Sequence, residues 1–278
     1  MESTVATDNS INQDKDTEIL TRRMSLVRNK LVVLSGKGGV GKSTVSVNLA
    51  AELCRRGNRV GLLDVDLHGP SIPGMLNLKG TEVRTDGEAM LPVDFRGMKV
   101  MSLGFMLESD KEPVIWRGPM KMGAIRQLLK DVVWGELDYL IIDSPPGTGD
   151  EPLSVCQLLG TVDGAVVVTT PQKVSIDDVR RSITFCAKLN MDVLGVVENM
   201  NGFVCPKCEE ITYIFKSGNG KTMAEEMGVR FLGSVPIDPA VVDACDTGKP
   251  FVLDFPESAA GKCFTSIADT ITQPLTEN

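Results

Sequence analysis

The chain has 278 residues, of which 42% are hydrophobic, and its formal net charge is −8. This length fits one large α/β domain or two small ones, and the acidic balance disfavours non-specific binding to nucleic acid or anionic lipid. No apolar run approaches the roughly 18–20 residues that a membrane-spanning helix needs, so we expect neither nucleic acid nor a membrane among the partners.

The chain begins with a polar segment. Residues 1–28 are rich in Asp, Asn, Ser and Thr, and we expect a disordered tail that could end in a short helix from Thr17 to Leu26. The first residues do not read as a secretory signal. The seven cysteines are scattered and odd in number, which does not describe a disulfide framework. The sequence therefore predicts a cytoplasmic protein with one domain over 29–278.

From Lys30 onward, apolar runs typical of strands alternate with helix-like segments. The predicted strands are 30–35, 59–64, 98–103, 138–143, 164–169, 193–198 and 230–235. The predicted helices are 43–56, 116–134, 175–189, 219–228, 238–247 and 257–271. Residues 75–97 predict a loop or a small hairpin. The repeated βα units predict an α/β fold with a doubly wound, mostly parallel sheet flanked by helices.

The first predicted strand leads into a glycine-rich loop. The loop and the helix start that follows are Gly36, Lys37, Gly38, Gly39, Val40, Gly41, Lys42, Ser43 and Thr44. This is G-x-x-x-x-G-K-[ST] between a strand and a helix, the context in which backbone N–H groups converge on phosphates. Lys42 is expected to contact the β- and γ-phosphates, and the Ser43 hydroxyl is expected to ligate Mg²⁺. The chain is therefore interpreted as a P-loop NTPase.

Acidic residues follow two other predicted strands at the edge where a parallel sheet binds ligands. Asp66 is the candidate that orients or activates the attacking water, and Asp64 is expected near Mg²⁺. Asp143 fits the Mg²⁺-linked aspartate after a hydrophobic strand. In the loop that follows, Gly147 is expected to donate its N–H to a γ-phosphate. The alternative is that the three aspartates merely cap helices.

A second motif, Cys205-Pro206-Lys207-Cys208, brings two thiols close together. Such a pair can bind a metal or a cluster, or form a redox disulfide. Structural zinc sites and iron–sulfur clusters usually need four ligands, and two copies facing each other across a twofold axis would supply them. Iron–sulfur ligation and zinc in the same place both remain open, and a thioredoxin-like redox role is less favoured.

The other ionisable ligand candidates have simpler interpretations. The only histidine, His68, is expected to be a solvated loop residue. The remaining cysteines fall in predicted helices, where a free cysteine is commonly a small buried hydrophobe. They are Cys54, Cys156, Cys186, Cys245 and Cys263. No Asn-Lys-x-Asp motif that reads guanine is present, which favours ATP over GTP.

The phosphate loop has a second lysine, Lys37, directly after its first glycine. The form Gly-Lys-Gly-Gly-x-Gly-Lys-Ser resembles the deviant P-loop of the MinD, ParA and nitrogenase iron protein class. That resemblance implies a homodimer in which Lys37 reaches across to the nucleotide of the partner. Lys37 is thus a candidate catalytic residue together with Lys42.

Over about residues 28–255 the chain resembles the Mrp/ApbC family of iron–sulfur carrier ATPases. The motifs that carry the resemblance are the P-loop, 64–71, 116–120, 143–150, Asn199-Met200 and 205–208. The resemblance implies an ATP-hydrolysing homodimer that holds a labile [4Fe–4S] cluster between its subunits and transfers it to apo-proteins. It also implies that Asn199, Pro236 and Asp238 flank the adenine, although an Asn closing a strand and an Asp capping a helix are equally open.

Two departures from this family bear on the interpretation. Some relatives carry an N-terminal site with four cysteines, and residues 1–28 contain none, so a second cluster is not expected. Glu209 follows Cys208 where relatives commonly have glycine, which puts the conformation of the loop in doubt.

Two other functions compete with a cluster carrier. The first is a positioning ATPase of the ParA or MinD kind, which needs a basic surface for DNA or a basic amphipathic terminal helix for membranes. The second is an ATP-dependent reductase that resembles the nitrogenase iron protein, whose cluster ligands are well separated rather than paired in one C-x-x-C.

Overall fold

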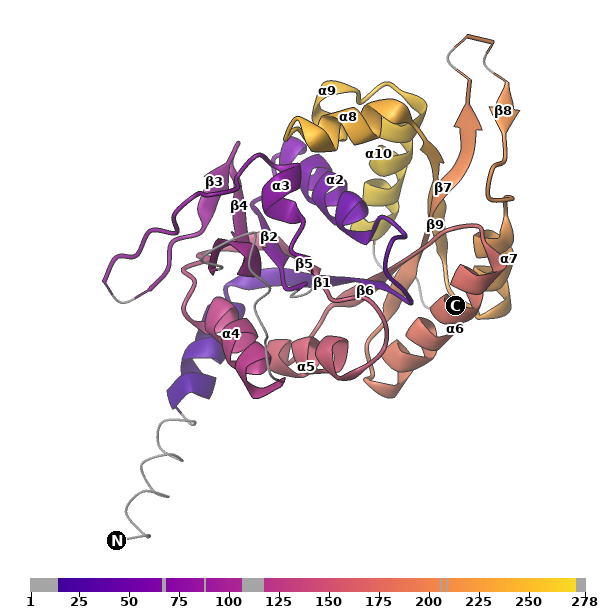
Figure 1. Ribbon diagram of the computed structural model, residues 1–278. Coiled ribbons are helices and arrows are strands. Elements are labelled where there is room, and N and C mark those ends of the chain that lie inside the picture. Colours follow the sequence, from indigo (N-terminus) through magenta and orange to yellow (C-terminus); the bar gives the residue numbers. More distant parts are fainter. Residues whose placement is uncertain are drawn as a thin grey trace, which may run out of the picture.

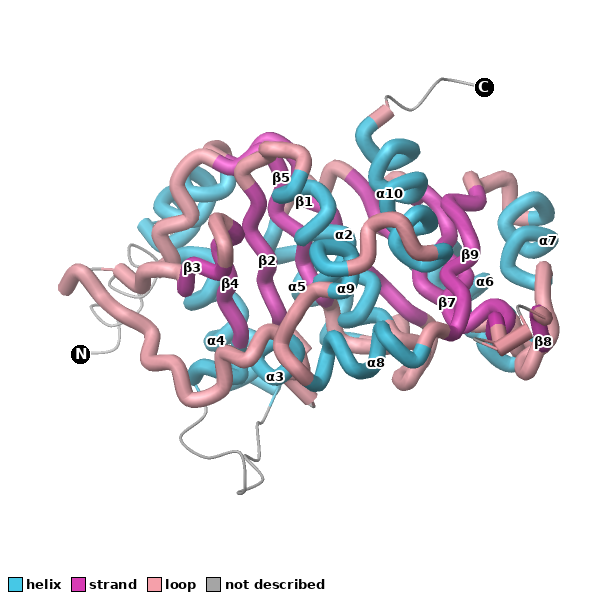
Figure 2. The backbone as a smooth tube through the Cα atoms, turned by 90° about the horizontal axis from the view of Figure 1, so that it is seen from above, coloured by secondary structure: helices cyan, strands magenta, loops and turns pink. Residues whose placement is uncertain are grey.

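The computed structural model describes residues 15–66, 69–87, 89–106, 118–205, 207–208 and 210–273. Its strands are β1 (Val27–Ser35), β2 (Val60–Asp64), β3 (Val93–Phe95), β4 (Met98–Ser102), β5 (Leu137–Asp143), β6 (Gly164–Thr169), β7 (Val193–Val204), β8 (Ile211–Thr212) and β9 (Phe231–Ile237). They form one sheet in the order β3-β4-β2-β5-β1-β6-β7-β8, and β9 also pairs with β7 (Figure 2). Within the described residues, only β3 and β8 run antiparallel to a neighbour. The predicted doubly wound, mostly parallel α/β fold is confirmed.

Helices cover both faces of this sheet. They are α2 (Lys42–Arg55), α3 (Ile72–Met75), α4 (Gly118–Lys130), α5 (Asp150–Leu159), α6 (Lys173–Lys188), α7 (Asn219–Glu226), α8 (Pro239–Asp246), α9 (Phe251–Asp254) and α10 (Ala259–Thr272), with a 3-10 turn η1 at Leu103–Met106. Helices α2, α3, α8, α9 and α10 lie on one face, and α4, α5 and α6 lie on the other (Figure 1). None of the helices in the described part of the chain is long and apolar enough to cross a lipid bilayer.

The central strand β1 is buried on both sides because its side chains alternate between two cores. Leu31 and Val33 belong to the core that contains α2 and α10. Val32 and Leu34 belong to the core beneath α4 and α5. A strand covered on both faces reads as a continuous apolar run, which explains why the sequence pattern located it. The phosphate loop therefore starts from the rigid centre of the sheet.

The short helix expected at Thr17–Leu26 is present at residues 15–24, but residues 15–28 pack on the domain and are not part of a disordered tail. Residues 15–24 are helical and β1 begins at Val27, whereas residues 1–14 lie outside the described part of the chain. Met24 is only 5% exposed and packs in the core beneath α4. Asp16 forms a 2.8 Å ion pair with Lys130 of α4. A buried methionine and a tertiary ion pair supply the contacts that the polar composition did not suggest.

Two further elements differ from expectation. No bounds were predicted for helix α5, although Cys156 was expected in a helix and acidic residues in its first turn, Asp150 and Glu151, favour a helix N-terminus. Strand β7 was expected to end at residue 198 before a loop. It continues to Val204, which pairs with Ile211 of β8, so the two cysteines lie in the turn of a β-hairpin. The predicted helix start at 116–117 lies outside the described residues, and α4 is described from Gly118.

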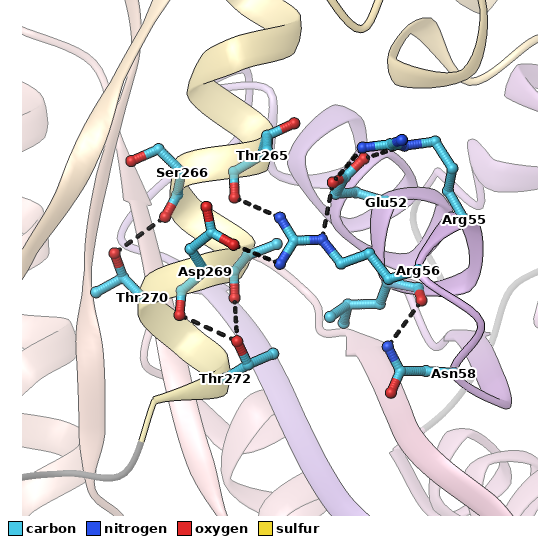
Figure 3. A network of polar contacts seen from close by, with 11 residues as sticks. Glu52, Arg55, Arg56, Asn58, Thr265, Ser266, Asp269, Thr270 and Thr272 are labelled. Carbon is cyan, nitrogen blue, oxygen red and sulfur yellow. Dashed lines mark hydrogen bonds and ion pairs between the residues drawn. The ribbon is translucent and has the colours of Figure 1, made fainter.

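Helix α2 is fastened to the C-terminal helix α10 by a charged network centred on Glu52 (Figure 3). The Glu52 side chain is fully buried and accepts hydrogen bonds from Arg55 and Arg56 at 2.8–2.9 Å. Arg56 also donates to Asp269 and to the Thr265 carbonyl of α10, both at 2.7 Å. Burial raises the pKa of Glu52, but the hydrogen bonds from Arg55 and Arg56 outweigh it and leave that pKa lowered.

We expect Glu52→Gln to lower the free energy of unfolding at pH 7 by about 1–2 kcal/mol, because charge-assisted hydrogen bonds are lost. Since the folded pKa of Glu52 is lowered, its stabilisation is present above the ordinary value of 4.5 and is lost as the pH falls through the folded pKa. The difference between wild type and variant should therefore shrink in acid. Denaturant unfolding from pH 7 down to pH 3 measures it. Glu136→Gln is the matched control, because the exposed Glu136 also pairs with an arginine and should change stability much less.

Candidate functional site

The phosphate loop leaves the carboxyl end of β1 and closes on the first turn of α2. Gly41 is the N-cap of α2, has φ of +82°, and no side chain caps this helix. A Cβ at Gly41 would lie 2.2 Å from Nδ2 of Asn199, and a Cβ at Gly36 would lie 2.4 Å from Cβ of Asp178 in α6. Glycine is required at both positions by the close approach of neighbours. The uncapped N–H groups of the first turn form a site for an anion.

Asp143 at the end of β5 gathers three side chains of α2. Ser43 Oγ donates to its Oδ2 at 2.6 Å, and Ser46 Oγ donates to its Oδ1 at 2.7 Å. Lys42 Nζ lies 2.9 Å from the same Oδ2. The structure thus brings together Lys42, Ser43 and Asp143, which the sequence predicted to act as one site. A hydroxyl beside a buried carboxylate is a donor set that suits Mg²⁺.

The Lys42 ammonium is buried but not saturated. Its side chain is 6% exposed and lies 2.9 Å from Asp143 Oδ2 and 3.8 Å from Asp66 Oδ2. In the described part of the chain, Lys42 Nζ has these two ion-pair contacts, but neither partner meets the geometry of a hydrogen bond. An ammonium has three donors, and a buried donor without an acceptor is unfavourable. Oxygens of a phosphate in the glycine loop would satisfy them, so the chain fits the predicted nucleotide.

Asp64 lies beside Asp143 in the sheet and is fully buried. Its Oδ1 accepts from the Asp66 N–H at 3.1 Å, and its Oδ2 accepts from Ser102 Oγ at 3.0 Å and from the Ile72 N–H at 3.3 Å. Burial and the charge of Asp143 raise the pKa of Asp64. Asp64 therefore holds the backbone that carries Asp66 toward Lys42. A direct role of Asp64 at Mg²⁺, like water activation by Asp66, stays a prediction.

Two other predicted phosphate ligands have different partners here. The Gly147 N–H, expected to meet a γ-phosphate, donates to the Ser35 carbonyl at 2.8 Å. Contact with a phosphate would require this bond to break. The Lys37 carbonyl accepts from Ser35 Oγ at 2.9 Å. Lys37 is half-buried, and its side chain has no ion pair in the described part of the chain. Its action across a dimer remains a prediction.

Of the residues predicted to flank adenine, Asn199 lies in the middle of β7, and Pro236 and Asp238 lie at the end of β9. Asn199 is 7% exposed, and its amide donates to the Val40 carbonyl of the phosphate loop at 2.9 Å. Asp238 caps α8 by accepting from the Ala240 N–H at 2.9 Å, which is the capping alternative. Thr44 hydrogen-bonds to Cys245 of α8, so this helix lies beside the start of α2. Adenine contacts of Asn199, Pro236 and Asp238 stay predictions.

The turn between β7 and β8 presents the paired cysteines. The Cys205 N–H donates to the Glu210 carbonyl at 3.0 Å and closes the hairpin. Hydrogen bonds to the Cys205 sulfur from the N–H groups of Lys207 and Cys208, and from the Cys208 thiol, lower the pKa of Cys205. A lowered pKa favours the thiolate, the form that ligates metal. No third Cys, His, Asp or Glu of the described residues completes a metal site here. Pro206 and Glu209 lie outside them, as does His68.

The remaining cysteines are separate from this turn. Cys156 and Cys186 are buried in the core beneath α4 and α5, and Cys54, Cys245 and Cys263 are half-buried in helices. Burial raises the pKa of each of these thiols. All five lie in helices as predicted, but only Cys156 and Cys186 are buried as expected, and the other three are partly exposed.

Sequence reasoning missed two polar side chains that shape the site. Ser46 holds the second oxygen of Asp143, and Ser102 holds Asp64. Ser46 could have been found, because it lies three residues after Ser43 on the same face of a helix. Ser102 ends β4, which neighbours β2, and only the strand order reveals that contact.

Comparison with known proteins gives consistent matches. A family model described as ParA: NUBPL iron-transfer P-loop NTPase matches residues 26–272. The iron-sulfur cluster carrier protein of Methanocaldococcus jannaschii is 52% identical over 235 residues, which cover 84% of this chain and 81% of that protein. The cytosolic Fe-S cluster assembly factor NUBP2 of Rattus norvegicus is 50% identical over 250 residues, which cover 88% and 92%. A nucleotide-binding protein from Archaeoglobus fulgidus, solved in complex with ADP, matches with a TM-score of 0.76 and 40% identity over 84% of this chain and 92% of that one.

Proposed function

The chain belongs to the family of NUBPL iron-transfer P-loop NTPases, and from this we propose that it is an ATP-hydrolysing carrier of iron–sulfur clusters. The observation that carries the proposal is the hairpin turn at the end of β7. There, two backbone N–H groups lower the pKa of Cys205, next to the exposed Cys208. A pair of thiols in this arrangement suits soft metal ions and iron–sulfur clusters. The cluster is the cargo, and apo iron–sulfur proteins are the clients.

The nucleotide half of the proposal uses the site on α2. The loop 36–41 and the first turn of α2 bind the phosphates of ATP, and Lys42 supplies the fixed positive charge. Ser43 and Asp143 hold Mg²⁺, which when bound offsets negative charge that develops on the phosphates. Asp66, held toward Lys42, orients the attacking water. Loss of the γ-phosphate changes the acceptors available to Lys42 and to the backbone of the loop.

The cluster half of the proposal needs a second copy of the chain. Cys205 and Cys208 supply two ligands, and the described residues offer no third in reach. A [4Fe–4S] cluster takes four thiolates, which two copies related by a twofold axis provide. Zinc in the same turn is the main competitor, because thiolates also suit zinc. In such a dimer Lys37 would act on the nucleotide of the partner.

The competing functions have less support. The relatives that are about 50% identical are named as a cluster carrier and a cluster assembly factor, which does not support a positioning ATPase. A reductase that resembles the nitrogenase iron protein has no observation in its favour here. Because one relative is named cytosolic, we place the function of this chain in the cytosol.

Anaerobic reconstitution of the full chain with iron and sulfide tests the function. A bridging cluster predicts about two iron and two sulfide ions per chain, in a species that sediments as a dimer. Metal analysis of the same sample separates iron from zinc. A chain that hydrolyses ATP yet stays a monomer without bound iron after reconstitution would contradict the proposal.

A further inference from the structure

Strand β7 carries contacts to both functional parts of the molecule. Asn199, in its middle, touches the phosphate loop, and Cys205 follows directly after its last residue, Val204. We call residues 200–205, 207–208 and 210–217 the cysteine arm. The hairpin in this arm projects beyond the body of the molecule at the upper right of Figure 1. A single strand thus runs from the phosphate loop to the cysteine turn.

The contact at the loop is tight. The Asn199 amide donates to the Val40 carbonyl at 2.9 Å. Its Nδ2 lies 2.2 Å, and Met200 Cε lies 3.7 Å, from the position that a Cβ at Gly41 would take. Both are therefore in direct contact with the backbone of the loop. Asn199 is only 7% exposed, so its side chain cannot turn away into solvent. A shift of residues 40–41 therefore displaces Asn199 as well.

Strand β7 is irregular immediately after this contact, at residues 200–202. Met200 and Gly202 have positive φ values of 60° and 80°. Asn199 pairs with Val235 of β9 and Phe203 with Ile237, so three residues of β7, 200–202, lie opposite one residue of β9. Such a bulge interrupts the ladder and bends the strand. The arm is thus joined to the sheet at a point where its direction is not fixed by regular pairing.

The far end of the arm returns to the same place. The fully buried Glu198 accepts from the Gly220 N–H at 2.6 Å and from the Gly218 N–H at 3.3 Å. The segment that enters the arm and the segment that leaves it are therefore both fastened at residues 198–199. A displacement there moves the base of the arm as one unit.

We propose that Asn199 is the positioning residue through which the nucleotide in the phosphate loop sets the position of the cysteine arm. When phosphate contacts shift Val40 and Gly41, Asn199 follows, and the bulge at 200–202 turns this shift into a reorientation of the turn with Cys205 and Cys208. The cargo role of that turn rests on the proposed function. The movement itself belongs to the chain, with or without a cluster.

Hydrogen exchange of the cluster-free chain tests this movement. Wild type is compared with and without a saturating non-hydrolysable ATP analogue and Mg²⁺. We expect the analogue to change exchange in the arm by about fivefold or more, the lower end of typical coupling between sites. In Asn199→Ala the ratio of exchange rates in the arm with and without the analogue should fall to about one. The analogue should still protect the phosphate loop at saturation.

Asn201→Ala is the matched control. Asn201 lies on the same strand, but its amide donates to Ser234 of β9 at 2.9 Å rather than to the phosphate loop, so this variant should keep the response of the arm. Asn199→Asp keeps the shape of the side chain but cannot donate to Val40, and it replaces the alanine variant if that one does not fold. An arm that still responds in a folded Asn199 variant, or that does not respond in wild type, overturns the proposal. If the arm responds as expected but reconstitution yields no iron, the coupling stands and the carrier function fails.

Discussion

Replacing Lys42 by alanine should lower the rate of ATP hydrolysis by about 10²–10³-fold or more, the usual loss when one preorganised group that stabilises developing charge is removed. The Lys42 ammonium is the buried cation between Asp143 and Asp66. Without it, the charge on the β- and γ-phosphates loses its fixed counter-charge, and the two carboxylates face the nucleotide uncompensated. We therefore expect nucleotide affinity to fall together with turnover. Phosphate release at saturating ATP and calorimetric titration with an ATP analogue measure the two effects.

Lys30→Ala is the control for this variant. Lys30 lies on the same strand as the start of the phosphate loop, is 8% exposed, and pairs with Asp163 at 3.4 Å. The two variants thus remove a buried lysine with an acidic partner, but only one of them removes it from the nucleotide site. We expect Lys30→Ala to lower stability and to leave turnover per folded molecule within about twofold, as for a site outside the reaction. Equal turnover in the Lys42 variant and wild type would place hydrolysis elsewhere.

Replacing Cys205 and Cys208 together by serine should remove bound iron, from about two ions per chain to nearly none. Cys205 is half-buried and Cys208 is exposed, so the fold does not depend on their packing. A serine hydroxyl is a poor ligand for the soft iron of a cluster. Iron and sulfide counts after anaerobic reconstitution, together with the visible absorption of the cluster, measure the loss.

Cys263→Ser is the control for the cysteine variant. Cys263 is half-buried in α10, and burial raises its pKa, so the thiolate that binds metal is disfavoured there. This variant should keep the iron content of wild type. Undiminished iron in the Cys205 and Cys208 double variant would rule out the hairpin turn as the ligand site.

The sequence predicts the centre of the fold well because burial leaves a strong pattern there. The run before Asp143 was expected at 138–143 and is β5, Leu137–Asp143. The residues 199–202, with two asparagines and a glycine, are typical of a turn and were expected to end β7. They instead form a bulge, because Phe203 and Val204 regain partners in β8. Local composition cannot distinguish a turn from a bulge when the deciding partner lies later in the chain.

The candidate site, too, could be predicted from the sequence only in part. Lys42, Ser43 and Asp143 were predicted as a group because the carboxyl ends of neighbouring parallel strands meet, and they are in contact. The partners of Asp64 and Asn199 could not be predicted. Asp64 satisfies its oxygens within the chain, and Asn199 bonds to the phosphate loop. Both facts depend on which polar group lies within about 3 Å, a scale at which motif reading gives no information.

The network of Glu52, Arg56 and Asp269 has a mechanical consequence for the nucleotide site (Figure 3). Helix α2 starts at the phosphate loop, and its other end is bonded to α10, so its position in the molecule is fixed at that end. When phosphate contacts displace the loop, α2 cannot follow by sliding along its axis. In the proposed movement, a displacement of the phosphate loop is therefore passed to β7 through the hydrogen bond between Asn199 and Val40. Loss of the Arg56 hydrogen bonds should let α2 move toward α10 and take up part of that displacement.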